Sequence, residues 1–185
     1  MKSLIGAGLL AIAGLTTGTA SHAAWPERPI TLIIPAAPGG TTDIVARLIS
    51  EKLGAALGTT IVIENKAGAA GIIGTQALVR AAPDGYTLIM GNIGPNSINY
   101  SLYKNLPYKA TDFAPISLVI AVPNILVVNS KSPYTSVKEL VDAVKNDPKG
   151  NYSFGSSGTG QSPHLSSEMF TQRTGITMTH IPFKG

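Results

Sequence analysis

The segment from Ile30 to Asp43 constrains the fold of this chain more than any other. A β-branched, largely apolar run, Ile30–Ile34, leads through a turn rich in proline and glycine into a helical pattern that starts at Thr42. Such a run is typical of a strand covered on both faces. A helix that starts so soon after a strand aims free backbone N–H groups at one point, where an anion can bind without a charged side chain. The same residues also fit an ordinary strand-to-helix connection.

Residue types within this turn fit either interpretation. Gly39 and Gly40 lack the Cβ atoms that would keep a ligand away from the backbone. Thr41, Thr42 and Asp43 are types suited to capping the helix that follows. We therefore expect a capped helix start that is open to a small anion.

Residues 1–23 have the pattern of a secretory signal peptide. Lys2 precedes an apolar run from Leu4 to Leu15, and small residues lead to a cleavage site after Ala23. The run is shorter than the roughly 20 apolar residues that a transmembrane helix needs. We expect export to an oxidising compartment. Because the chain has no cysteine, packing alone must stabilise it there.

The composition indicates an α/β protein and excludes several functions. Hydrophobic residues make up 44% of the chain and aromatic residues only 6%, which favours a core of small aliphatic side chains. The net charge of +4 comes from scattered Lys and Arg residues, with no basic cluster interleaved with aromatics, so nucleic-acid binding is not expected. Without cysteine or an H-E-x-x-H pattern, the chain predicts no metal site, and no cofactor is expected.

Strand and helix patterns alternate along the chain and predict βαβ units with mostly parallel sheets. We expect a first lobe over residues 24–122 and a second over 123–185, with the apolar runs at 116–122 and 125–128 forming the crossover. Ser136 and Glu139 have capping-box spacing at one helix start. The predicted strands are 30–35, 60–64, 86–90, 152–156 and 177–181, and the predicted helices are 42–57, 71–82, 96–103, 136–146 and 162–173.

The second lobe contains its own glycine-rich turn between a strand and a helix. Ser156, Ser157, Thr159 and Ser162 supply hydroxyl groups around this turn, and for Ser162 we expect a capping role at the helix that follows. Two turns of this kind on two lobes predict a cleft that holds a small acid from both sides. A solvated loop is the structural alternative.

Other functional interpretations fit the same residues less well. A small exported serine hydrolase would use Ser156 or Ser157 with His164, but the G-x-S-x-G motif is absent. His164 also suits a structural, hydrogen-bonded role at a helix start, and His180 suits a core or cleft position. The glycines from 68 to 74 depart from the dinucleotide-binding pattern, so we expect them to add N–H groups at the rim of the cleft.

Several separate motifs together resemble the tripartite tricarboxylate transporter substrate-binding proteins, also called the Bug or TctC-like family. The resemblance implies a two-lobed, hinge-closing periplasmic-binding-protein-like α/β fold. It also implies a monomeric receptor, not an enzyme, that captures a small organic acid such as a di- or tricarboxylate. Such a receptor delivers its ligand to membrane transporter subunits of the tripartite tricarboxylate type. The motifs lie at residues 25–29, 35–43, 62–71, 83–87, 106–108, 112–116, 155–164 and 180–185.

The resemblance also implies which residues bind the ligand. In the family, backbone N–H groups, hydroxyls and waters from the two turns hold the carboxylate. Asp43 is better suited to organising its turn, because a carboxylate beside an anionic ligand would repel it. The implied positions are Ala36, Gly39, Gly40, Thr41 and Asp43 in the first lobe and Ser156, Thr159, Gly160 and Ser162 in the second, supported by His164 and Lys184.

The chain is shorter than the family pattern. It stops at Gly185, part-way through the expected second lobe, so that lobe and the C-terminal return to the first lobe are incomplete. We therefore expect a C-terminally truncated product or an incomplete record. A non-functional remnant of the receptor is a further alternative, marked by exposed apolar surface and non-cooperative melting.

Overall fold

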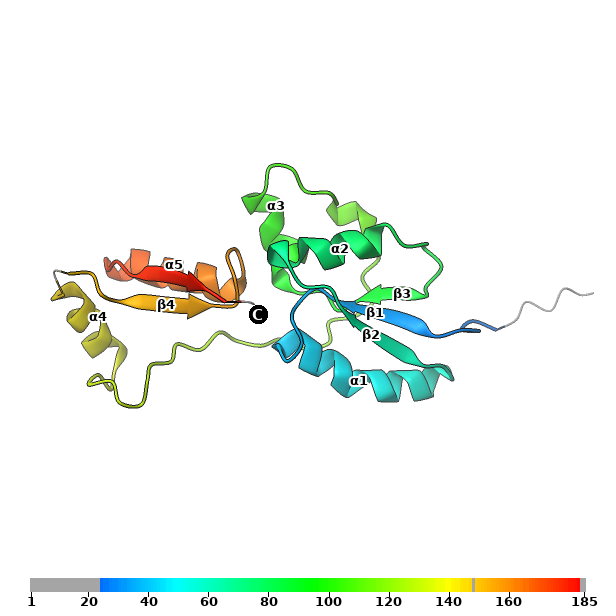
Figure 1. The fold of residues 1–185 in the computed structure, drawn as a ribbon, viewed down its shortest axis with the longest axis horizontal. Coiled ribbons are helices and arrows are strands. Elements are labelled where there is room, and N and C mark those ends of the chain that lie inside the picture. Colours follow the sequence, from blue (N-terminus) through cyan, green and yellow to red (C-terminus); the bar gives the residue numbers. More distant parts are fainter. Residues whose placement is uncertain (1–23, 148, 184–185) are drawn as a thin grey trace, which may run out of the picture.

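The computed structural model describes residues 24–147 and 149–183. Two parallel sheets, one of three strands and one of two, lie at opposite ends of the described chain, and the carboxyl ends of their strands face each other (Figure 1). An extended segment without regular secondary structure, residues 113–129, runs between the two units. Among the described residues, none of the helices has the length and hydropathy needed to cross a membrane.

The first sheet has β1 (Ile30–Ile34) at its centre, with β2 (Ile61–Asn65) and β3 (Thr87–Ile89) parallel on either side. Helices α1 (Thr41–Leu57) and α2 (Ile72–Val79) lie on opposite faces of this sheet (Figure 1). This arrangement explains why β1 is almost fully buried and confirms the prediction of a strand covered on both faces.

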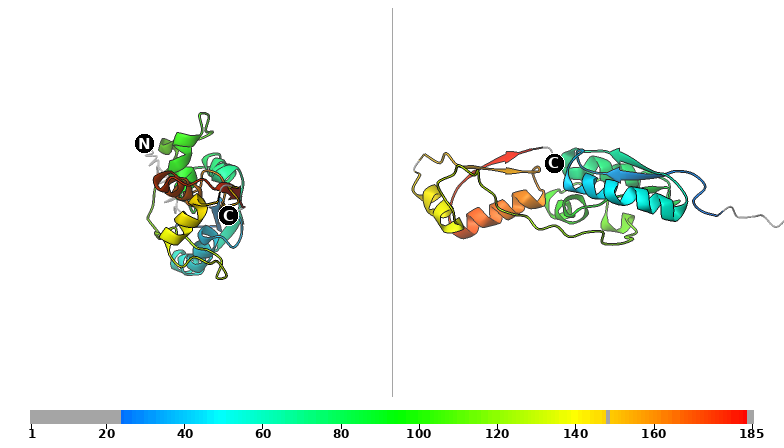
Figure 2. Two further views of the ribbon diagram at one scale, coloured as in Figure 1. Left: turned by 90° about the vertical axis from the view of Figure 1, so that its left-hand side faces the viewer. Right: turned by 90° about the horizontal axis from the view of Figure 1, so that it is seen from below.

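The second sheet pairs β4 (Ser153–Ser156) with β5 (Thr179–Pro182). Helices α4 (Val137–Lys145) and α5 (Ser162–Thr174) lie on one side of these two strands (Figure 2). A small core of Leu140, Val144 and Ile176 joins them. Four shorter elements complete the described structure: η1 (Ala69–Gly71), η2 (Gly94–Ile98), α3 (Asn99–Leu102) and η3 (Ala110–Asp112).

The structure confirms the predicted order of strands and helices but corrects some boundaries. Helix α2 ends at Val79, not at residue 82, because Arg80 begins the turn that leads to β3. The apolar runs at 116–122 and 125–128 form no ladder with any described strand. Ile116, Leu118 and Val127 are about four-fifths exposed, at 81%, 84% and 78%. The lobe boundary between residues 122 and 123 falls inside this extended segment and stays a prediction.

Ser136 is the N-cap of α4, as its spacing predicts. Its Oγ accepts a hydrogen bond from the Glu139 N–H at 3.2 Å. In a capping box, the Glu139 carboxylate would accept a hydrogen bond from the N–H of the N-cap, Ser136. Here it accepts from the N–H of the preceding residue, Thr135, at 2.7 Å. These bonds lower the pKa of Glu139, with the Thr135 backbone bond as the largest cause.

Replacing Ser136 by alanine should lower the free energy of unfolding by about 1 kcal/mol, because an N–H at the helix start loses its acceptor. Ser136→Asp is the matched control, since aspartate retains a capping oxygen and should keep most of the stability. Urea denaturation of both variants measures the difference. Equal losses in the two variants would contradict a capping role.

Candidate functional site

The candidate site lies where the facing ends of the two sheets meet. In the first sheet, β1 leads into α1 on one face and the neighbouring β2 leads into α2 on the other (Figure 1), and ligands of open α/β sheets bind outside the carboxyl ends of the strands at such a point. In the second unit, β4 leads into the glycine-rich turn before α5. Gln161, the N-cap of α5, packs against Gly94 of η2, where an added Cβ would lie 2.5 Å from the Gln161 Oε1. The second predicted turn therefore lies against the connection that follows β3 in the first unit.

Asp43 shapes the first turn from inside the fold. The residue is 2% exposed, and its Oδ2 accepts a hydrogen bond from the Gly39 N–H at 2.8 Å. Arg47, one helical turn later, places Nη2 2.9 Å from the Asp43 Oδ1. Asn65, at the end of β2, donates through Nδ2 to the Asp43 Oδ1 at 2.9 Å and to the Ala36 carbonyl at 3.2 Å. Strand β2 and helix α1 thus hold the turn through one carboxylate.

These contacts keep the Asp43 carboxylate ionised. The Arg47 guanidinium, followed by the Gly39 N–H and the Asn65 amide, holds the pKa of Asp43 far below its usual range. The positive charge of Arg47 also offsets the negative charge of Asp43. The turn can therefore accept an anion nearby with less repulsion than a lone carboxylate would cause.

The structure corrects the predicted capping of α1. The N-cap is Gly40, and no side chain caps this helix. Thr41 and Thr42 are the first helical residues, so their hydroxyls cannot occupy the cap position. Asp43, at the third position, bonds backward to Gly39. The N–H groups of the first helical residues have no acceptor within the helix and remain available at the turn.

Ser156 has a comparable position in the second turn. It is 7% exposed, and its Oγ accepts a hydrogen bond from the Gly158 N–H at 3.1 Å. The same Oγ lies 2.7 Å from Nε2 of His180 on β5. Gly158 and Gly160 have positive φ angles of 126° and 80°, which a side chain would strain. Both turns therefore contain a buried polar side chain that accepts from a glycine N–H.

The second turn lies against a stack of three rings. His180 is 5.0 Å from Phe154 and 4.0 Å from His164, measured between ring centroids. His164 accepts a hydrogen bond through Nδ1 from the Gly160 N–H at 3.2 Å, and its Nε2 lies 3.5 Å from Glu168. Burial, followed by the neighbouring His164, lowers the pKa of His180.

Two further predictions for this turn are corrected. The N-cap of α5 is Gln161, and Ser162 is the first helical residue, so Ser162 does not cap the helix. Its hydroxyl instead donates to the Asn124 Oδ1 at 3.4 Å. The serine–histidine pair is Ser156 with His180, not Ser156 or Ser157 with His164, because the His164 Nδ1 is already bonded to the Gly160 N–H. Lys184 lies outside the described residues.

The sequence-based prediction missed Arg47, Asn65 and Gln161. It placed His180 in the core or the cleft but did not count it among the binding residues. The spacing of Asp43 and Arg47, four residues apart on one helix, was a usable signal for their ion pair. The contact of Asn65 depends on the pairing of Ile34 with Asn65, which only the sheet register reveals. The contact of His180 with Ser156 likewise depends on the sheet register, which pairs His180 with Phe154.

The glycine-rich loop after β2 forms the third connection near this region. Gly68, Ala69, Ala70 and Gly71 all have positive φ angles, as the short helix η1 leads into α2. The Asn99 Nδ2 donates to the Ala70 carbonyl at 3.1 Å and holds this conformation. The predicted contribution of its N–H groups to the cleft rim stays a prediction.

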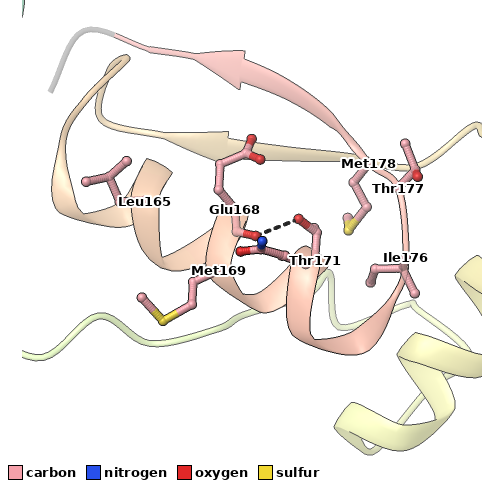
Figure 3. A pocket seen from close by; sticks show the side chains of 8 residues that line it. Leu165, Glu168, Met169, Thr171, Ile176, Thr177 and Met178 are labelled. Atoms are coloured by element: carbon pink, nitrogen blue, oxygen red, sulfur yellow. Dashed lines mark hydrogen bonds between the residues drawn. The ribbon is translucent and has the colours of Figure 1, made fainter. Parts of the chain in front are cut away.

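The grooves on α5 do not coincide with most of the predicted site residues. A groove of about 600 Å³ lies beside α5, near Met169, Ile176 and Met178 (Figure 3). The Thr171 hydroxyl there bonds to the Glu168 carbonyl at 2.9 Å. Another groove, of about 520 Å³, lies between α5 and η2 and includes Ser162. Within residues 24–147 and 149–183, no cluster of three or more potential metal ligands occurs.

Comparison with known proteins identifies the family of this chain. Residues 45–185 match the family described as tripartite tricarboxylate transporter family receptor. The chain belongs to this receptor family. It is 40% identical to protein BugT of Bordetella pertussis, in a match that covers 96% of this chain and 56% of BugT. The chain spans about half the length of the curated relatives it matches.

Solved structures of similar proteins confirm the fold class. Rpa4515 of R. palustris with adipate has a TM-score of 0.83 and 37% identity, with 88% of this chain and 54% of that protein covered. MatC of Rhodopseudomonas palustris with bound malate has a TM-score of 0.79 and 33% identity, with 87% of this chain and 55% of MatC covered. The periplasmic binding protein BugD is also similar, with a TM-score of 0.72 and 36% identity over 87% of this chain and 54% of BugD. The predicted receptor family and its two-lobed α/β fold are therefore confirmed.

Proposed function

We propose that this chain forms part of a periplasmic receptor that binds a small carboxylate and delivers it to a transporter of the tripartite tricarboxylate type. The observation that carries this proposal is the pair of turns at the facing ends of the two sheets, each shaped by a buried acceptor on a glycine N–H. Helix starts of this kind favour negative charge. The similar proteins with adipate and with malate support a dicarboxylate as the ligand.

The turns suggest a division of roles among the predicted residues. Gly39, Thr41 and Thr159 are exposed at the turns and are proposed to contact the ligand. Asp43 and Ser156 are buried and are proposed to act by shaping the backbone. The remaining proposed positions are Ala36, Gly40, Gly160, Ser162, His164 and Lys184.

The location and oligomeric state of the receptor follow from the same reasoning. Relatives described as periplasmic support a periplasmic location, and the predicted signal peptide, which lies outside the described residues, would supply export. A small acid held between two turns of one chain does not require a second copy. We therefore propose a monomer.

Thermal denaturation with a panel of acids tests the proposed function. A ligand that binds only the folded protein stabilises it by about 2.7 kcal/mol at 100 times its dissociation constant. Malate, adipate and a tricarboxylate should raise the melting temperature, whereas an uncharged diol of similar length should not. An unchanged melting temperature with every acid in the panel would overturn the proposal.

An assay of ester hydrolysis distinguishes the receptor from the alternative, a serine hydrolase. With an ester substrate, a receptor should show no turnover in either the wild type or His164→Ala. Turnover that disappears in His164→Ala or in His180→Ala would favour the hydrolase.

A further inference from the structure

We propose that His180 is a proton-linked positioning residue of the second turn, so that binding of a carboxylate at this turn is accompanied by proton uptake on His180. This inference rests on the proposed function. It concerns a residue that the predicted site did not include. The geometry around Ser156 carries it.

The first step is the hydrogen-bond inventory of Ser156. Its hydroxyl has one proton and accepts from the Gly158 N–H at 3.1 Å. The possible acceptors for its proton are Nε2 of His180 at 2.7 Å and the Gly158 carbonyl at 3.2 Å. When Nε2 is unprotonated, the shorter distance favours donation from Ser156 to His180. The hydroxyl proton then lies in the hydrogen bond to His180 and cannot be donated to a ligand.

Protonation of His180 reverses this hydrogen bond. An imidazolium must donate through Nε2, so the Ser156 Oγ becomes the acceptor and its own proton can turn to the Gly158 carbonyl, 3.2 Å away, or to an anion at the turn. The Ser156 hydroxyl is then no longer held by the imidazole and can donate to an anion, and the positive charge of His180 lies 2.7 Å from its Oγ. Both changes favour an anion at the turn.

The surroundings of His180 keep it neutral in the absence of an anion. Burial and the stacked His164 both lower the pKa of His180, while Glu168 raises it. His164 and Glu168, both on α5, are the titratable groups that act on His180 among the described residues. Strand β4 contributes Phe154 and Ser156, which do not titrate in this range. A bound carboxylate would place a negative charge near His180 and so stabilise its protonated form.

The first turn provides the contrast. Its buried acceptor, Asp43, has a pKa far below the physiological range because Arg47 and the Gly39 N–H stabilise the carboxylate. Asp43 therefore stays ionised at every pH where the receptor works. The pH dependence of binding should come from the second turn alone.

Binding affinity as a function of pH tests this inference, with malate and adipate as the probes. Binding and protonation are reciprocal, so wild-type affinity should rise between pH 7.5 and pH 5.5 by about fivefold or more. His180→Gln and Ser156→Ala should each lose this rise, because one removes the titrating group and the other its connection to the turn. His164→Asn removes the other imidazole of the ring stack and should still show a rise, moved to higher pH because His164 lowers the pKa of His180. Only the pH dependence of this variant is compared, because His164 is itself a proposed binding position. Ionisation of the probes is common to all four proteins and cancels in the comparison.

A second measurement on the wild type guards against variants that fail to fold. The ¹H NMR titration of the His180 ring should show a higher pKa with saturating malate or adipate than without a ligand. Equal pH dependence in the wild type and His180→Gln, or an unchanged His180 pKa, would overturn the inference and leave the proposed function intact. If neither probe binds at either pH, both the inference and the choice of a dicarboxylate ligand are overturned.

Discussion

Replacing Ile34 by alanine is expected to lower the free energy of unfolding by about 2–5 kcal/mol. Ile34 is fully buried at the end of β1 and packs with Leu32, Ala36 and Ala46 between the sheet and α1. Alanine would leave a cavity at the residue that immediately precedes the first turn. Urea denaturation followed by circular dichroism gives the difference in free energy.

Val62→Ala is the matched control for this prediction. Val62 lies on the neighbouring strand β2 but is 42% exposed, so its truncation removes less buried surface. We expect its effect to stay below about 1 kcal/mol. Similar losses for both variants would show that the packing around Ile34 is looser than the structure describes.

Replacing Asp43 by alanine is expected to weaken ligand binding by about tenfold or more, because the Gly39 N–H and the Arg47 guanidinium both lose their acceptor. The change acts on the shape of the turn and leaves an unpaired positive charge beside it. Titration calorimetry with malate or adipate measures the loss. The melting temperature reports the accompanying loss of stability.

Asp43→Asn and Asp142→Ala are the controls for this prediction. Asparagine retains an acceptor for the Gly39 N–H but loses the ion pair, so its affinity should fall between those of the wild type and Asp43→Ala. Asp142 pairs with Lys138 on the exposed face of α4, and its replacement should leave affinity unchanged. An Asp43→Ala protein that binds malate or adipate as tightly as the wild type would exclude the proposed role of Asp43.

The sequence predicted the secondary structure well where the patterns were long and local. The apolar run at Ile30–Ile34 and the helix that follows it have strong periodicity, and glycine ends that helix at Gly58 in the left-handed conformation. The cap at Ser136 is also a local feature of the chain. These elements therefore appear within one or two residues of the predicted bounds.

The candidate site was only partly predictable, because its contacts depend on sheet register. Asn65 reaches the first turn because β2 pairs in parallel with β1, and His180 reaches Ser156 because β5 pairs in parallel with β4. No pattern within either strand indicates these contacts. The capping predictions for Thr42 and Ser162 failed because residue preferences identify a helix start but not which residue occupies the cap.

The two turns are stabilised independently of each other. The bonds that shape the first turn come from α1 and β2, and those that shape the second come from β5 and α5. A mutation in one turn can therefore alter half of the proposed binding surface while the other half retains its geometry. Under the proposed function, the ligand preference can change through one turn at a time, so duplicated receptors can acquire new ligands in small steps.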